Sequence, residues 1–176
     1  MFKGRNVAKW TVALIGLLMP AMAHATGSTV TTISITATVD GFAEWASSTG
    51  TIAASDFSGH ITAANQSVTA SLANTLYTNI TTTITPTAGA HSGVLTNGTQ
   101  TLTTAYQITG VDTPDSAYKL ADATSGDFFD VANTYTLTHS SGTGSYTVHL
   151  LAQASSGALA PDSGNYTCGV VLTASW

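Results

Sequence analysis

Histidines, serines and carboxylates are the side chains of this sequence that could bind a metal or transfer a proton, and their spacing supports neither chemistry. The histidines beyond residue 25 stand far apart, and none belongs to a closely paired zinc motif such as H-E-x-x-H. Serines are abundant, but no G-x-S-x-G nucleophile motif is present. We therefore expect no catalytic residue, no metal site and no cofactor, and a protein that is not an enzyme. The histidines are His60, His91, His139 and His149.

One concentration of acidic residues surrounds Gly126 and consists of Asp122, Asp127 and Asp130. Carboxylate oxygens are the ligands that calcium prefers, so this cluster is the best candidate for a cation site. Its spacing differs from the regular ligand positions of an EF-hand loop. A solvated turn is the favoured interpretation, and calcium binding is the alternative.

The first residues have the pattern of a secretory signal peptide, residues 1–25. A basic stretch precedes an apolar run over residues 12–22, and small residues typical of a cleavage site follow. The run is too short for a permanent membrane span, and no later stretch approaches the roughly 20 apolar residues that a span needs. We expect an exported chain with one domain after cleavage. The basic residues are Lys3, Arg5 and Lys9, and the cleavage site is Ala23-His24-Ala25.

Removal of this leader changes the charge balance of the chain. Lys119 then stands alone against nine acidic side chains, so that the net charge is 1 − 9 = −8. Phosphate binding needs clustered Lys and Arg, so nucleic acid is excluded as an expected partner. Cys168 is the only cysteine, and no intramolecular disulfide can form. We expect it to be a small buried hydrophobe, with an intermolecular bridge as the alternative.

The segment Thr29–Asp40 has the two-residue period of a β strand. Apolar residues fall on one face, while threonine and serine occupy the other. β-Branched residues fit a pleated, half-buried surface, which strengthens the prediction of a strand here. The apolar residues are Ile33, Ile35, Ala37 and Val39.

The same period recurs along the rest of the chain, with turn signals such as Asn97-Gly98 and Ser141-Gly142 between the segments. Many short strands separated by such turns predict an all-β fold, an antiparallel β-sandwich. The alternative for one stretch, Ala63–Ala73, is a short turn of helix. The further expected strands are Ser67–Leu72, Leu76–Thr85, Thr99–Thr109, Phe128–Leu137, Tyr146–Ala152 and Tyr166–Trp176.

Two ends of the exported chain resemble a known family. The run Ile33-Ser34-Ile35-Thr36-Ala37-Thr38-Val39-Asp40 and the run from Ala160-Pro161-Asp162 through Tyr166-Thr167 to Gly169-Val170-Val171 are similar to major subunits of enterobacterial colonization-factor fimbriae. These pilins are assembled by the alternate chaperone-usher pathway. The middle, from Leu95-Thr96-Asn97 to the strand containing Tyr106, is compatible with them. Spore-coat-U-like secreted pilins end in a similar strand. This sequence departs from the family at Cys168 and Trp176.

The resemblance implies an immunoglobulin-like sandwich that lacks its final strand and exposes an apolar groove. A periplasmic chaperone fills that groove first, and at the outer-membrane usher the N-terminal strand of the next subunit replaces it by donor-strand exchange. Residues 26–40 are then the donor strand and residues 41–176 the pilin domain. The donor side chains are Ile33, Ile35, Ala37 and Val39, and the acceptor strand carries Tyr166, Val170 and Leu172.

The expected function is that of a structural subunit of a surface fimbrium or pilus, exported through the periplasm to the cell surface for adhesion or biofilm formation. Its partners are identical or related pilin subunits, the chaperone and usher, and a possible host receptor. Two alternatives remain open. The N-terminal strand could be an internal edge strand of a closed sandwich. The chain could instead be a secreted carbohydrate-binding module that uses Trp45, Tyr77 and Tyr118.

Overall fold

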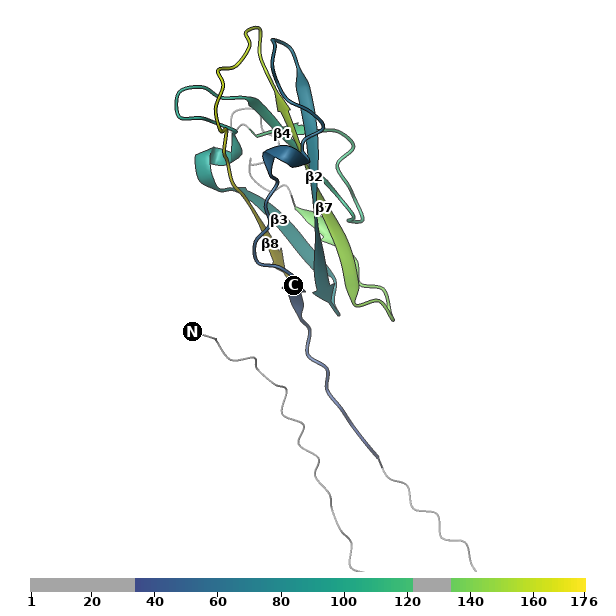
Figure 1. The fold of residues 1–176 in the computed structure, drawn as a ribbon. Coiled ribbons are helices and arrows are strands. Elements are labelled where there is room, and N and C mark those ends of the chain that lie inside the picture. Colours follow the sequence, from purple (N-terminus) through teal and green to yellow (C-terminus); the bar gives the residue numbers. More distant parts are fainter. Residues whose placement is uncertain (1–33, 122–133) are drawn as a thin grey trace, which may run out of the picture. The chain divides into compact units, whose positions relative to one another are not determined.

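The computed structural model describes residues 34–121 and 134–176 (Figure 1). The chain divides into two units, Met1–Thr38 and Val39–Trp176. The second unit is nearly all β, with two antiparallel sheets and two short 3-10 helices, Ala54–Asp56 and Ala90–Gly93. The predicted all-β, antiparallel fold class is therefore confirmed. Among the described residues, no helix has the length and apolar character needed to cross a membrane.

The larger sheet has five strands in the order β1-β2-β7-β4-β5. Its two longest strands, β2 and β7, pair along most of their lengths, from Ser67 opposite Ser155 to Tyr77 opposite Ser145. The alternation of β-branched and small residues that predicted these strands also sets their two faces. The strands are β1 (Ala43–Trp45), β2 (Ser67–Thr78), β7 (Ser145–Ser155), β4 (Thr103–Thr109) and β5 (Lys119–Leu120).

The smaller sheet has three strands in the order β6-β3-β8. They are β6 (Tyr135–Leu137), β3 (Thr82–Ala88) and β8 (Val170–Ser175). In the part of the chain that the structure describes, β8 pairs with β3 alone, so its other edge is open. This open edge becomes one wall of the groove described below.

The two sheets pack face to face around one apolar core. Ile84 and Leu137 from the smaller sheet belong to the same buried cluster as Leu76, Ile108 and Val148 from the larger one. All five are at most 2% exposed. Burial of such side chains is worth about 1.5–3 kcal/mol each, so this layer is the main source of stability in a chain without disulfides.

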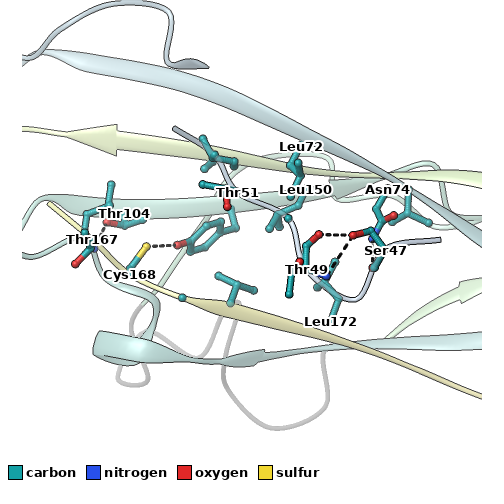
Figure 2. Close-up of a pocket in the computed structure, with 18 of the residues that line it drawn as sticks. Ser47, Thr49, Thr51, Leu72, Asn74, Thr104, Leu150, Thr167, Cys168 and Leu172 are labelled. Atoms are coloured by element: carbon teal, nitrogen blue, oxygen red, sulfur yellow. Dashed lines mark hydrogen bonds between the residues drawn. The ribbon is translucent and has the colours of Figure 1, made fainter. Parts of the chain in front are cut away.

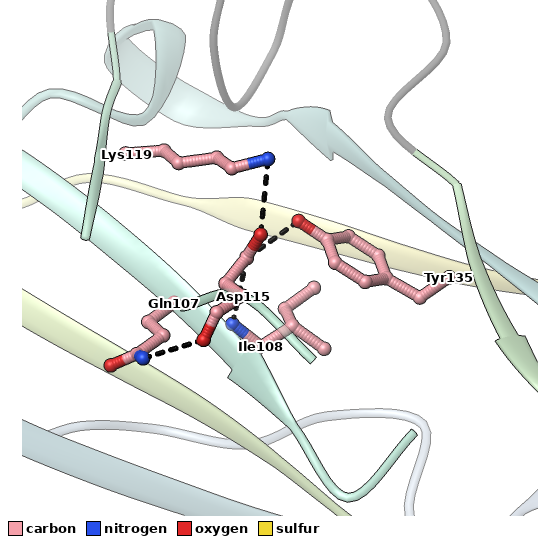
Figure 3. A network of polar contacts seen from close by, with 5 residues as sticks. All are labelled: Gln107, Ile108, Asp115, Lys119 and Tyr135. Carbon is pink, nitrogen blue, oxygen red and sulfur yellow. Dashed lines mark hydrogen bonds and ion pairs between the residues drawn. The ribbon is translucent and has the colours of Figure 1, made fainter. Parts of the chain in front are cut away.

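A buried carboxylate joins the two sheets at the β4–β5 side (Figure 3). Asp115 Oδ2 accepts hydrogen bonds from the Ile108 amide on β4, at 3.0 Å, and from the Tyr135 hydroxyl on β6, at 2.6 Å. Asp115 Oδ1 lies 3.0 Å from the ammonium group of Lys119. Burial, followed by the hydrogen bond to Asp115, raises the pKa of Tyr135. Every oxygen of this carboxylate thus has a partner, as a buried charge requires.

Two strand predictions need correction. The expected strand Leu76–Thr85 is divided, because β2 ends at Thr78 and β3 begins at Thr82. The Thr78 hydroxyl contacts the Ile80 carbonyl at 2.7 Å and the Thr82 hydroxyl at 3.0 Å, and these bonds hold a turn. The helical alternative for Ala63–Ala73 is wrong from Ser67 onward, because that part belongs to β2.

The other expected strands agree in place, with shifted ends. Those over Ser67–Leu72 and Tyr146–Ala152 are longer than expected, as β2 and β7, whereas those over Thr99–Thr109 and Tyr166–Trp176 are shorter, as β4 and β8. Phe128–Leu137 is described only from residue 134 onward, where β6 lies. Strands β1 and β5 have too few residues for their period to stand out in the sequence.

The predicted strand over Thr29–Asp40 is not formed in the described residues 34–40, because none of the strands that the structure describes pairs with them. Ile35 and Val39 are 90% and 78% exposed, and Ala37 is exposed as well. Ile33 lies outside the described residues. In a single chain, the apolar side chains of this segment occupy every second position but are exposed.

Candidate functional site

One wall of the candidate site is the segment Ser47–Ile52, which follows β1. The last backbone hydrogen bond to β2 before this segment runs from the Ala46 amide to the Thr75 carbonyl, at 2.8 Å. The next one after it runs from the Ser58 amide to the Thr69 carbonyl, also at 2.8 Å. Between these points the segment forms no strand, although Asn74 Nδ2 donates to the Ser47 carbonyl at 2.9 Å. The chain therefore lies beside the larger sheet without completing its ladder.

Gly50 permits this segment to lie close to the sheet. A Cβ atom at this position would stand 2.5 Å from Leu72 Cδ2, which is closer than carbon atoms tolerate. The Ser47 hydroxyl donates to the Thr49 carbonyl at 2.5 Å and tightens the bend before it. Small and hydroxyl-bearing residues thus shape this wall, which has no apolar alternation of its own.

The opposite wall is the open edge of β8 together with the residues that lead into it. Cys168, Val170 and Leu172 follow one another at every second position and line the same cavity. The chain before β8 is held on its other side by bonds between Gly169 and the segment Gly89–Ala90, at 2.9 and 3.0 Å. The backbone of this wall is thus hydrogen-bonded on the side away from the groove and unpaired on the side that faces the groove.

The floor of the cavity consists of apolar side chains of the larger sheet, mainly Leu72, Leu150 and Ala152. Figure 2 shows Ser47, Thr49 and Thr51 on one side, Cys168 and Leu172 on the other, and Leu72 and Leu150 behind them. The cavity has a volume of about 430 Å³. No backbone hydrogen bond joins the segment Ser47–Ile52 to β8 within the described residues. The result is a groove between two backbones that do not pair with each other.

A polar spot lies at the Cys168 end of the floor. The Tyr106 hydroxyl donates to the Gly93 carbonyl at 2.7 Å and lies 3.2 Å from Cys168 Sγ. Burial is the main cause that raises the pKa of Tyr106, and it also raises the pKa of Cys168, where the hydrogen bond with Tyr106 opposes it. Since the thiolate is the reactive form, this cysteine is suited to packing and not to nucleophilic chemistry.

Trp45, at the end of β1, also lines the groove. Its indole N–H is buried and has no hydrogen-bond partner among the described residues. A buried donor without an acceptor costs about 1–3 kcal/mol, and native structures contain few of them.

Open backbone edges over an apolar floor suit one kind of ligand, an extended peptide. Such a peptide adds to the sheet edge through main-chain hydrogen bonds and places every second side chain in the groove. The described part of the groove contains no cluster of three or more metal-binding side chains, and its one thiol has a raised pKa. Main-chain pairing with an added strand is an interaction that the open edge of β8 and the apolar floor can support.

The structure brings the predicted acceptor residues together. Tyr166, Val170 and Leu172 all line the groove, on the β8 side. The other wall, Ser47–Ile52, and the floor residues Leu72 and Leu150 were not anticipated from the sequence. The donor residues Ile35, Ala37 and Val39 are exposed, as stated above, and their entry into a neighbouring subunit remains a prediction.

The aromatic residues of the carbohydrate-binding alternative do not share a surface. Trp45 lies on β1 and Tyr118 beside β5, and these strands are the opposite edges of the larger sheet. Tyr77 pairs with Glu44, the neighbour of Trp45, and is exposed, whereas Trp45 packs against the core. The three side chains therefore do not form one binding platform.

The calcium cluster Asp122, Asp127 and Asp130 lies outside the described residues. A scan against protein-family models gives no match for this chain, and a search of curated proteins gives none either. The functional interpretation therefore depends on the groove itself and on the sequence pattern of the N-terminal segment.

Proposed function

We propose that this protein is a structural subunit, a pilin, of a bacterial surface fimbrium, and that it polymerises by donor-strand exchange. The observation that carries the proposal is the groove between Ser47–Ile52 and the open edge of β8. The partner is a second copy of the same or a related subunit, which supplies its N-terminal segment. The filament serves adhesion or biofilm formation at the cell surface.

The strand order supports an immunoglobulin-like sandwich with one strand missing. In such domains strands A, B, E and D form one sheet and strands C, F and G the other. Here β1-β2-β7-β4 has the chain order expected of A-B-E-D, and β3-β8 that expected of C-F. The place of strand G, beside β8, is the open side of the groove. A strand from another molecule would complete the sheet there.

The N-terminal segment has the properties of the missing strand. It offers apolar side chains at every second position, its other face is threonine and serine, and it contains no charge before Asp40. Burial of each Ile or Val is worth about 1.5–3 kcal/mol, and each ladder hydrogen bond about 0.5–1.5 kcal/mol. Several of each outweigh the ordering of one short segment, so no disulfide is required.

The leader and the assembly pathway belong to the same proposal. A signal peptide over residues 1–25 directs the chain to the periplasm, where an unfilled groove and an apolar segment would aggregate without protection. A periplasmic chaperone that occupies the groove until the usher exchanges it for the next subunit provides that protection. The resemblance of the two chain ends to colonization-factor pilins supports this pathway.

The direct test is the variant Ile35→Asp in the full chain. A carboxylate carried into the apolar groove would be buried without a partner, so filaments should be lost. The matched control is Thr36→Asp, which adds the same charge on the other face of the segment. Electron microscopy of cells that produce each variant gives the readout. Filaments of normal number with Ile35→Asp would refute the donor role.

A further inference from the structure

The end of the sandwich at which the N-terminal segment begins has an exposed apolar patch. It consists of Phe42, Ile80 and Trp176, which are 44%, 38% and 63% exposed. They surround Gly41, where a Cβ atom would lie 3.2 Å from Ile80 Cδ1 and 3.7 Å from Trp176 Cδ1. We name these three residues the root patch, because the N-terminal segment leaves the sandwich beside them.

Hydrogen bonds to Asn79 hold the root patch together. Its side-chain oxygen accepts from the Phe42 amide at 2.8 Å, and its side-chain nitrogen donates to the Asp40 carbonyl at 2.8 Å. The Thr78 hydroxyl donates to the Phe42 carbonyl at 2.9 Å. The backbone at the base of the segment is therefore fixed, and the patch is a defined surface and not a loose end.

Another exposed apolar residue, Leu159, lies at the opposite end of the sandwich from the root patch. Leu159 is 82% exposed and follows β7, which runs from Ser145, near the root patch, to Ser155. The same loop reaches the groove, because Asp162 accepts a hydrogen bond from the Tyr166 hydroxyl at 3.1 Å. Leu159 lies three residues before Asp162, which is at most about 11 Å along an extended chain.

The direction of strand addition brings these two surfaces together. All strand pairs described in this fold are antiparallel, and we take the added strand to pair with β8 in the same way. β8 runs toward Trp176, so an antiparallel guest strand would end near Tyr166, at the Leu159 end. The base of the donor segment, and with it the donor's root patch, would then meet the loop of Leu159.

From this juxtaposition we propose that the root patch of each subunit docks on the Leu159 loop of the subunit that accepts its N-terminal segment. This inference rests on the proposed function, because a second copy of the chain is the partner. The contact uses two different surfaces of the same molecule, so it can repeat head to tail along a filament. The contact fixes the angle between successive subunits. Without it, the subunits would be joined by one extended segment alone and the angle between them could vary.

Cross-linking of paired cysteines tests the contact. Ile80→Cys and Leu159→Cys, alone and together, are introduced into the full chain, and filaments purified from the producing cells are treated with a short bis-maleimide. The double variant should give a ladder of covalent oligomers, and each single variant should give monomers. Cys168 is common to all three chains, so it does not account for a difference.

Filament stiffness is the second readout. Trp176→Ser and Leu159→Ser should each leave filaments that assemble but bend more, measured as a loss of persistence length in electron micrographs. Leu120→Ser, which removes an exposed leucine on β5, is the matched control and should keep the stiffness of the unaltered chain.

The outcomes separate the two proposals. Filaments that form but neither cross-link in the double variant nor soften with Trp176→Ser and Leu159→Ser would overturn the docking contact and leave donor-strand exchange intact. Absence of filaments from the unaltered chain, in cells that also produce its chaperone and usher, would overturn the proposed function and the docking contact with it.

Discussion

The hydroxyl of Tyr106 lies 3.2 Å from the sulfur of Cys168, across the floor of the groove. The two residues come from different sheets, since Tyr106 belongs to β4 and Cys168 leads into β8. Their contact joins the wall of the groove to its floor at the point where an added strand would end. The thiol is half-buried, and burial raises its pKa.

Alkylation of Cys168 should therefore report whether the groove is filled. In the free subunit the reaction with iodoacetamide should be slow at neutral pH and should accelerate as the pH rises, because a raised pKa leaves little thiolate. In filaments the inserted strand should cover the sulfur and suppress the reaction further. Mass spectrometry of the intact chain measures both rates, with the denatured chain as the reference. Equal rates in free subunits and filaments would contradict a filled groove.

A mixture of two variants, one defective as acceptor and one defective as donor, should separate these two roles of the subunit. Leu172→Asp places a charge in the acceptor groove and leaves the donor segment unchanged, whereas Ile35→Asp does the opposite. Each alone should remain monomeric, and their mixture should form dimers that grow no further, because only one productive joint exists. Size-exclusion chromatography distinguishes these species, and circular dichroism verifies the fold of each variant. Long polymers from the mixture would rule out this division of roles.

The floor of the groove should also contribute to the stability of the subunit. Leu150 is 9% exposed and belongs to the core, so Leu150→Ala should lower the free energy of unfolding by about 2–5 kcal/mol. Leu151→Ala, at the next position on β7 and on the opposite face, should cost clearly less. Urea unfolding of the monomer measures both changes. A larger loss with Leu151→Ala would contradict the assignment of faces.

The buried tyrosines should make the fold sensitive to alkali. The pKa values of Tyr106 and Tyr135 are raised in the folded chain above the ordinary value of 10.0, mainly by burial. Below pH 10 both states bind the proton, so this contribution to stability is constant. Above it the unfolded chain ionises first, and the free energy of unfolding should fall as the pH approaches the folded values.

Tyr135→Phe provides the control for this alkaline fall. The variant should be less stable near neutral pH by about 1–3 kcal/mol, because Asp115 loses a hydrogen-bond donor. Its stability should nevertheless decline less steeply above pH 10. Urea unfolding at a series of pH values gives the comparison. An unchanged slope would show that this hydroxyl titrates in the same way in both states.

The strands of the core could be predicted from the sequence because their alternation was long. β7 shows this best, with Val148, Leu150 and Ala152 buried at every second position. The division between β2 and β3 could not be predicted in the same way, because hydroxyl bonds of Thr78 and Thr82 hold the turn, and threonine is also a common strand residue. The predicted continuous strand was therefore wrong at that point.

Only one side of the candidate site was anticipated, and it came from the resemblance to fimbrial subunits. Val170 and Leu172 were expected in the acceptor strand, and both line the groove. The wall Ser47–Ile52 consists mainly of serine, threonine and glycine, and its place beside Leu72 and Asn74 is known only from the structure. The hydrogen bonds of the Asp115 carboxylate could not be predicted either, because they involve residues that are distant in the sequence, such as Tyr135.

The ion pair of Lys119 has a consequence for resistance to trypsin. In the proposed mature chain, which lacks residues 1–25, Lys119 is the sole position at which trypsin can cleave, because the other three basic residues belong to the proposed leader. That ammonium group is held 3.0 Å from the buried Asp115, so the bond beside it becomes a substrate only when the β4–β5 side opens. A fibre of such subunits should therefore resist trypsin better than chains with many exposed lysines and arginines.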